Sequence, residues 1–171
     1  MQKYESLFSD FHLHAAQLLL TGSDLGENKE RVLATIERLL SHGSIVPIIN
    51  ENDSVAVEEL RVGDNDMLSA RVAQLVGAQK LILLTTVDGL LDEQSELITE
   101  VEDVEKVLDF ARDESGKFSI GGMVTKLQAV ALATENGTEV IIANGRKPEQ
   151  LSDLAKGNGR RTRFFASPQI K

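Results

Sequence analysis

The sequence predicts an α/β protein: a three-layer α/β/α sandwich in which helices cover both faces of a mainly parallel β-sheet. Two observations lead to this prediction. Short apolar runs that suit buried strands alternate along the chain with segments of helical periodicity. The 171 residues are 42% hydrophobic, which supplies enough apolar material for one core. We therefore expect a single domain without a linker or an internal repeat.

Each predicted strand is a short apolar run. The five runs are residues 15–20, 45–49, 81–85, 140–143 and 163–165. Residues 55–62 have the pattern of a small hairpin, and residues 92–96 form a polar connection. Because helical segments separate most of the strands, the strands are expected to pair in parallel.

Three of the intervening segments carry the clearest helical patterns. In residues 27–41, one face of the predicted helix repeats apolar side chains, which are Val32, Ile36, Leu39 and Leu40. Residues 66–76 show the same periodicity. Residues 126–136 form a third, amphipathic helix that is followed by Gly137, a residue type that often terminates helices.

Composition excludes several classes of function. The chain contains no cysteine, which removes disulfides, thiolate nucleophiles and cysteine zinc sites. Its three histidines, His12, His14 and His42, lack metal-site spacing and are interpreted as structural. No apolar run approaches the roughly 20 residues that span a bilayer, and no secretory signal pattern is present. We therefore expect a cytoplasmic protein without a metal site of its own.

The formal charge of −9 argues against general nucleic-acid binding, which depends on clustered lysine and arginine. The basic residues concentrate only at Arg160, Arg161 and Arg163, and we interpret this segment as a solvated turn that enters the last strand. Lys147, which follows residues 144–146, is interpreted as a surface lysine, and a position near the nucleotide is the alternative. Local binding of a nucleotide remains compatible with the acidic charge, and magnesium would offset the charge of its phosphates.

Two clusters of acids and amides flank the predicted hairpin. The first, residues 50–53, follows the buried strand 45–49, where polar side chains can face a ligand. The second, residues 63–66, precedes a helix and resembles an N-cap. Asn and Asp also favour ordinary turns and caps. The two interpretations, ligand binding and local turns, have equal support from these residues alone.

A glycine pair opens the third helix. Gly121 and Gly122 precede Met123, and Lys126 falls in the first turn. A helix N-terminus attracts anions, glycine lets the backbone approach them, and lysine adds a full charge, so the segment suits phosphate. The spacing of a Walker A loop is absent. A simple junction between a loop and a helix is the alternative.

These motifs occur in a familiar order. NENDSV, VGDNDMLSA, KLILLTTVDGL and GGMVTKLQAV follow one another, and the chain as a whole resembles the glutamate 5-kinases of the amino-acid kinase superfamily. The resemblance implies ATP-dependent phosphorylation of the side-chain carboxylate of L-glutamate to γ-glutamyl phosphate, the first step of proline biosynthesis. It also implies Mg²⁺, a homo-oligomer and proline as a feedback inhibitor. Residues 1–79 would bind glutamate, and residues 80–171 would bind the nucleotide.

The resemblance assigns roles to individual residues. Asp53 and Asn65 match glutamate-binding positions, with Asn52 and Asp64 as neighbours. Asp66 matches the catalytic-site aspartate that organises active-site lysines, although it could also be a helix cap. Lys126 matches the lysine that contacts the transferring phosphoryl group. The expected nucleotide contacts are Thr85, Thr86, Gly121, Gly122, Met123, Val124, Thr125 and Lys126.

The sequence departs from the family pattern in two respects. Thr86 stands where glutamate 5-kinases commonly have aspartate, although Asp88 matches another frequent position. The N-terminal segments of the VKLGTS and SSGA types do not occur, so the chain resembles the later part of the kinase domain. The alternatives are an inactive nucleotide-binding or oligomer-forming remnant, one half of a split kinase, and another amino-acid kinase such as acetylglutamate or aspartate kinase.

Overall fold

The computed structural model describes residues 1–54, 65–92, 94–113 and 123–167. The chain forms two compact units, Met1–Leu68 and Ser69–Lys171, and each is described by itself. The predicted hairpin at 55–62, Asp64, Gly121 and Gly122 lie outside the described residues. Within the described part, no helix is long and apolar enough to cross a membrane.

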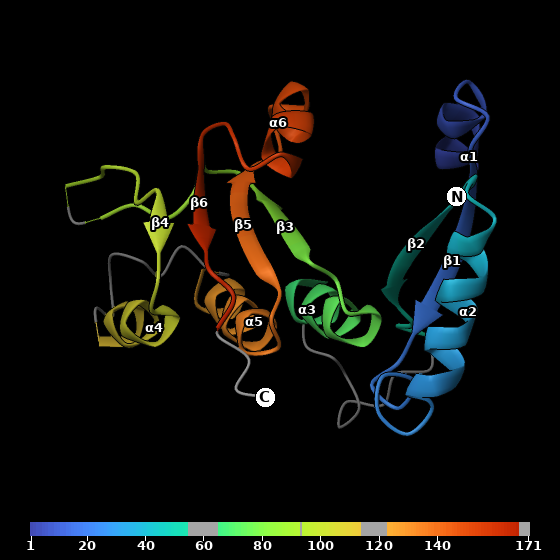
Figure 1. Ribbon diagram of the computed structural model, residues 1–171, viewed down its shortest axis with the longest axis horizontal. Helices are drawn as coiled ribbons and strands as arrows, with labels where there is room; N and C mark the ends of the chain where they lie inside the picture. Colours follow the sequence, from blue (N-terminus) through green and yellow to red (C-terminus); the bar gives the residue numbers. More distant parts are fainter. Residues whose placement is uncertain (55–64, 93, 114–122, 168–171) are drawn as a thin grey trace. The chain divides into compact units, whose positions relative to one another are not determined.

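The first unit is a strand–helix–strand motif preceded by a short helix (Figure 1). Its elements are α1 (Gln2–Ser9), β1 (His14–Leu20), α2 (Lys29–Ser41) and β2 (Ile45–Glu51). The strands pair in parallel from His14 opposite Ile45 to Leu20 opposite Glu51. Parallel pairing requires the crossover that α2 supplies, so both strands end at the same edge.

The inner face of α2 confirms most of the predicted apolar stripe. Val32 and Ile36 are 8% and 3% exposed. Leu39 is half-buried, but Leu40 is 53% exposed, contrary to the prediction. At about 100° per residue, Leu40 lies at the margin of the stripe that Val32, Ile36 and Leu39 define.

The second unit contains a mixed sheet and helices on both of its faces (Figure 1). The strand order is β3–β5–β6–β4. The strands are β3 (Lys80–Thr85), β5 (Glu139–Asn144), β6 (Arg161–Phe164) and β4 (Glu100–Val101). The helices are the end of α3 (Asn65–Val76), α4 (Val104–Asp113), α5 (Met123–Glu135), the 3₁₀ turn η2 (Pro148–Gln150) and α6 (Leu151–Ala155).

The sheet is mainly parallel, as predicted, with one antiparallel pair. β3 pairs in parallel with β5, and β4 pairs in parallel with β6. β5 and β6 are antiparallel, with Val140 opposite Phe164 and Ala143 opposite Arg161. As a result, the turn that precedes β6 lies at the same edge as the turns that follow β3 and β5.

Alternate residues of β5 contribute to separate cores, as expected for a strand buried on both faces. Val140 and Ile142 belong to the larger cluster, which α4 and α5 cover. Ile141 and Ala143 pack with Leu154 of α6 in the second cluster. The second unit therefore has the three layers that strand–helix alternation predicts.

Helix α5 is less amphipathic than the sequence pattern indicated. Leu127, Ala129, Val130 and Ala133 are all fully buried, although they spread around the helix. Alanine side chains let neighbouring elements approach on several sides. Thr134 is also buried, and its Oγ1 donates hydrogen bonds to backbone carbonyls one turn earlier. The surroundings of α5 therefore fix its position in the core.

Candidate functional site

In the first unit, the acid–amide cluster lies at the carboxyl edge of the two strands. The Asn52 N–H donates to the Leu20 carbonyl at 2.9 Å and extends the ladder beyond β2. Ser54 Oγ donates to Asn52 Oδ1 at 2.7 Å, which is the local turn that the simpler interpretation predicts. The next carboxylate, that of Asp53, is exposed and accepts no hydrogen bond from a described residue. The exposed position of Asp53 is compatible with a ligand contact, and its role in glutamate binding stays a prediction.

A second polar turn, which sequence reasoning missed, follows β1 at the same edge. The Thr21 N–H and Oγ1 donate to Asp24 Oδ2 at 2.8 and 2.7 Å. The Asp24 N–H in turn donates to Thr21 Oγ1 at 3.3 Å. Thr-x-x-Asp is a common capping pattern, so its sequence alone does not distinguish this position from any other turn.

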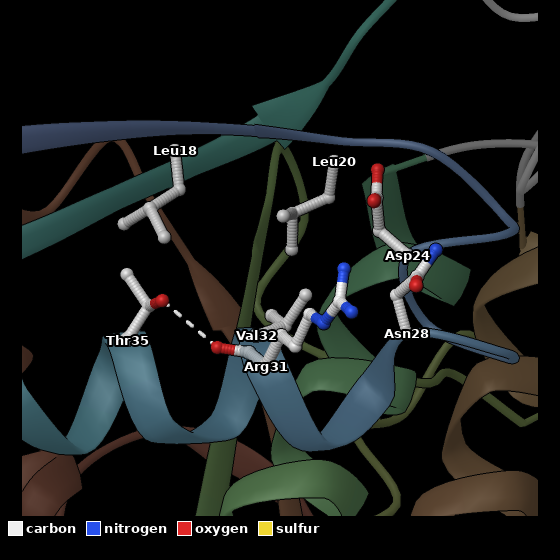
Figure 2. A pocket seen from close by; sticks show the side chains of 7 residues that line it. All are labelled: Leu18, Leu20, Asp24, Asn28, Arg31, Val32 and Thr35. Carbon is white, nitrogen blue, oxygen red and sulfur yellow. Dashed lines mark hydrogen bonds between the residues drawn. The ribbon is translucent and has the colours of Figure 1, made fainter.

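The first unit also contains a pocket of about 310 Å³ between β1 and α2 (Figure 2). Leu18 and Leu20 line it from the strand, and Val32 lines it from the helix. Its polar lining consists of Asp24, Asn28, Arg31 and Thr35. None of the predicted site residues lines this pocket, so it does not support their assignments.

Asn65 and Asp66 occupy the first turn of α3. Asn65 is exposed and Asp66 is half-buried. A carboxylate at this position favours the helix through the partial positive charge of its N-terminus. This electrostatic role is a local alternative to catalysis, and the catalytic role of Asp66 stays a prediction.

In the second unit, two of the residues predicted to meet the nucleotide, Thr85 and Thr86, lie at the carboxyl end of β3. Thr85 pairs with Asn144 at the last position of the ladder. The Gly145 N–H then donates to the Thr85 carbonyl at 2.8 Å. Thr85 is half-buried and Thr86 is exposed. Ligands of open α/β sheets bind in crevices at this edge, so both threonines are well placed for the predicted contact.

Asp88 collects three donors at this edge. Asn144 Nδ2 and Lys147 Nζ each lie 2.9 Å from Asp88 Oδ1, and Arg160 Nε lies 2.7 Å from Oδ2. The hydrogen bond from Lys147 is the main cause that lowers the pKa of Asp88 to about 2, followed by the bond from Asn144. We call Asp88, Asn144, Lys147 and Arg160 the Asp88 cluster. Lys147 is thus a surface lysine, with 40% of its side chain exposed, that has a carboxylate partner at this edge.

The Asp88 carboxylate is expected to stabilise the folded chain near neutral pH and to lose this contribution at acid pH. Its pKa is about 2 in the folded chain against an ordinary value of 3.8, so this contribution is complete above pH 3.8 and disappears as the pH falls through about 2. Chemical denaturation should show a steeper loss of unfolding free energy over this interval in the wild type than in Asp88→Asn. Equal pH slopes for the two proteins would contradict the prediction.

The basic segment 160–163 does not behave as a simple solvated turn, because Arg161 and Arg163 lie within β6 and only Arg160 precedes it. Arg160 belongs to the Asp88 cluster, and Arg163 pairs with Glu139 through Nε at 3.0 Å. The Arg163 guanidinium also lies 4.5 Å from the centre of the Phe165 ring. Burial raises the pKa of Glu139, but the bonds and charges of Arg163 and Lys80 outweigh it and lower the pKa. Two of these arginines therefore have intramolecular carboxylate partners.

The turn that holds Asp88 is also attached to β6 through Thr162, which is fully buried. The Leu90 N–H donates to Thr162 Oγ1 at 2.8 Å, and Thr162 Oγ1 donates to the Ile98 carbonyl at 2.6 Å. A Cβ at Gly89 would lie 2.4 Å from Thr162 Oγ1. Any residue larger than glycine at position 89 would therefore clash with Thr162.

The predicted phosphate segment enters the described residues at the start of α5. Met123 and Val124 are half-buried, Thr125 is exposed, and Lys126 is half-buried in the first turn. The N-terminal end of a helix presents amides without intrahelical partners, which favours an anion there. The predicted residues are thus divided between the two units: Asp53, Asn65 and Asp66 lie in the first, and Thr85, Thr86 and Lys126 lie in the second.

Comparison with known proteins provides the family. Residues 1–144 match the amino acid kinase family. Glutamate 5-kinase of Photobacterium profundum is 45% identical over 174 residues, which cover 96% of this chain and 46% of that protein. The glutamate 5-kinase of Clostridium acetobutylicum is 43% identical, with 96% of this chain and 65% of that protein covered. The chain thus spans about half to two thirds of the length of these relatives.

Solved structures of low identity share the fold. A carbamate kinase of Giardia has a TM-score of 0.58 at 20% identity, covering 79% of this chain and 47% of that chain. A UMP kinase of Ureaplasma parvum has a TM-score of 0.53 at 17% identity, covering 78% and 50%. A Giardia lamblia carbamate kinase bound to AMP-PNP has a TM-score of 0.56 at 20% identity, covering 78% and 44%. By its sequence match and its fold, the chain belongs to the amino acid kinase family.

Proposed function

We propose that the chain carries the later part of a glutamate 5-kinase domain, which transfers the γ-phosphoryl group of ATP to the side-chain carboxylate of L-glutamate. The observation that carries this proposal is the similarity to glutamate 5-kinases at 43–46% identity over 96% of the chain. The exposed carboxylate of Asp53 and the polar edge at Thr85 and Asn144 add support, because they lie where ligands meet parallel sheets.

The proposed reaction is a direct, in-line transfer. A carboxylate oxygen of glutamate forms a bond to the γ-phosphorus, and the bond from that phosphorus to the β–γ bridging oxygen breaks and releases ADP. Asp53 and Asn65 would hold and orient glutamate. Lys126 would stabilise negative charge on the transferring group, and Asp66 would organise the charged groups around it.

The nucleotide would lie against the second unit. Thr85 and Thr86 would contact it at the carboxyl edge of β3, and residues 121–126 would receive its phosphates. Mg²⁺ would arrive with ATP and neutralise phosphate charge when bound. In the described part of the chain, no three acidic or histidine side chains gather as a metal site.

The resemblance supports three further proposals: a cytoplasmic location, assembly as a homo-oligomer, and inhibition by proline. A reaction that consumes ATP and L-glutamate is expected to take place where both are available. Sedimentation of the purified protein tests the assembly. Titration with proline during turnover tests the inhibition.

The decisive experiment measures ADP release by the purified 171-residue chain with MgATP, in the presence and absence of L-glutamate. A parallel calorimetric titration measures nucleotide binding. Glutamate-dependent release supports the kinase, and L-aspartate, which is one methylene shorter, is the matched control substrate. Nucleotide binding without turnover favours the remnant or the split kinase. The absence of both signals would overturn the proposal for this chain.

A further inference from the structure

We propose that Asp88 is a positioning residue for the nucleotide: its carboxylate holds together the three turns that form the carboxyl edge of β3 and β5. This inference rests on the nucleotide site proposed above and adds to it a residue that touches no reacting atom. Its basis is the geometry of the Asp88 cluster, which joins segments that are distant in sequence.

Each partner of Asp88 comes from a different part of this edge. Asp88 itself lies in the turn after β3, and Asn144 is the last residue of β5. Lys147 lies in the turn after β5, and Arg160 immediately precedes β6. The cluster therefore holds together the turns after β3, after β5 and before β6. Asp88, Lys147 and Arg160 themselves lie beyond the paired residues of these strands.

The connection to the nucleotide is short along the chain. Thr85 and Thr86, the predicted contacts, precede Asp88 by three and two residues. The Asn144 side chain, besides donating to Asp88, accepts a bond from the Arg146 N–H at 3.0 Å and so shapes the adjacent turn. If the cluster opens, these turns gain conformations that do not fit the ligand. The observed dissociation constant then equals the intrinsic constant divided by the fraction of molecules that keep the competent conformation.

Charge strengthens this arrangement. Two cations, Lys147 and Arg160, face one carboxylate, and the Asp88 side chain is 22% exposed while theirs are 40% and 60% exposed. The low pKa of Asp88 keeps it ionised wherever nucleotide binding is measured near neutral pH. Replacing this carboxylate with an amide therefore removes the charge that holds both cations, while the size of the side chain is preserved.

The same sheet offers a matched control at its other end. Glu139 begins β5 and pairs with Arg163 and with Lys80, whose Nζ lies 3.3 Å from Glu139 Oε1. It is also a carboxylate between two cations, but it lies at the amino end of the strand that ends in Asn144. A purely structural role predicts similar consequences for the loss of either carboxylate.

The test measures the dissociation constant of ADP by calorimetry, and the melting temperature, for the wild type, Asp88→Asn and Glu139→Gln. We expect Asp88→Asn to weaken ADP binding by about tenfold, which corresponds to a competent edge in roughly one tenth of the molecules. Glu139→Gln is expected to keep the wild-type affinity within about twofold. Asp88→Glu should bind more tightly than Asp88→Asn, because Lys147 and Arg160 are long side chains that can follow the longer carboxylate.

The outcomes separate this inference from the function on which it rests. Wild-type protein that binds no ADP would overturn both. ADP binding by the wild type with equal affinity in Asp88→Asn would overturn the positioning role alone. If Asp88→Asn and Glu139→Gln weakened ADP binding equally and lowered the melting temperature equally, Asp88 would contribute only to general stability. That result would also overturn the positioning role.

Discussion

Replacing Lys126 with methionine is expected to lower kcat/KM for glutamate phosphorylation by about 10²–10³-fold, the usual effect of removing one group that stabilises charge in a transition state. Methionine keeps the length and the helix propensity of the side chain while it removes the ammonium. The residue lies half-buried in the first turn of α5, where the helix N-terminus already favours phosphate. Loss of the charge should therefore affect transfer far more than folding.

Two comparisons sharpen this prediction. Lys106→Met removes a lysine whose side chain is 83% exposed and forms an ion pair with Asp103 at the surface, so the kinetics of this variant should stay within about twofold of the wild type. Binding provides a second readout. Lys126→Met should weaken the binding of ATP but leave that of adenosine nearly unchanged, because adenosine has no phosphates. Unchanged ATP affinity and unchanged turnover in Lys126→Met would remove Lys126 from the mechanism.

Replacing Phe164 with alanine is expected to lower the free energy of unfolding by about 3–5 kcal/mol, the largest stability effect that we predict for a single side chain. Phe164 is fully buried and lies opposite Val140 across the antiparallel pair. It packs in the core that α4 and α5 cover, together with Leu127 and Val130. Truncation would remove a ring from the centre of this core, and the surrounding strands could close the cavity only in part.

Phe11→Ala is the matched control for this experiment. The same residue type is deleted, but Phe11 is 73% exposed, so the change is expected to stay within about 0.5 kcal/mol. Urea denaturation of the wild type and both variants gives the comparison. If Phe164→Ala and Phe11→Ala cost the same, the β6 face would not be a core of the folded protein.

Local pattern predicted the elements of the fold well. The runs 81–85 and 140–143 became β3 and β5 with one-residue differences at their ends, and the segment 27–41 became α2. These elements can be predicted from local hydrophobic patterns, because a buried strand needs an apolar run and a half-buried helix needs an apolar stripe. The two-residue strand β4 has no such signal, and it exists only because β6 lies beside it.

The direction of individual strands and the burial of individual side chains were harder to predict from the sequence. Nothing in the residues of β6 indicates that it runs antiparallel to β5, because the direction depends on how the chain returns through α6. Leu40 matches the α2 stripe in sequence but lies at its margin, where the strands do not cover it. Helix α5 was predicted to be amphipathic, yet neighbouring elements bury it on most sides.

The residues of the candidate site also fall into two groups, those that the sequence identifies and those that only the tertiary structure brings together. The sequence by itself determined the two acid–amide clusters, the glycine pair and Lys126, because each motif is contiguous and keeps its chemistry wherever the chain places it. Only the tertiary structure decided that Asp88 would meet Lys147 and Arg160, which are 59 and 72 positions away along the chain. Ion pairs at such separation leave no periodic trace in the sequence. They arise because a parallel and an antiparallel strand pairing bring three turns to one edge of the sheet.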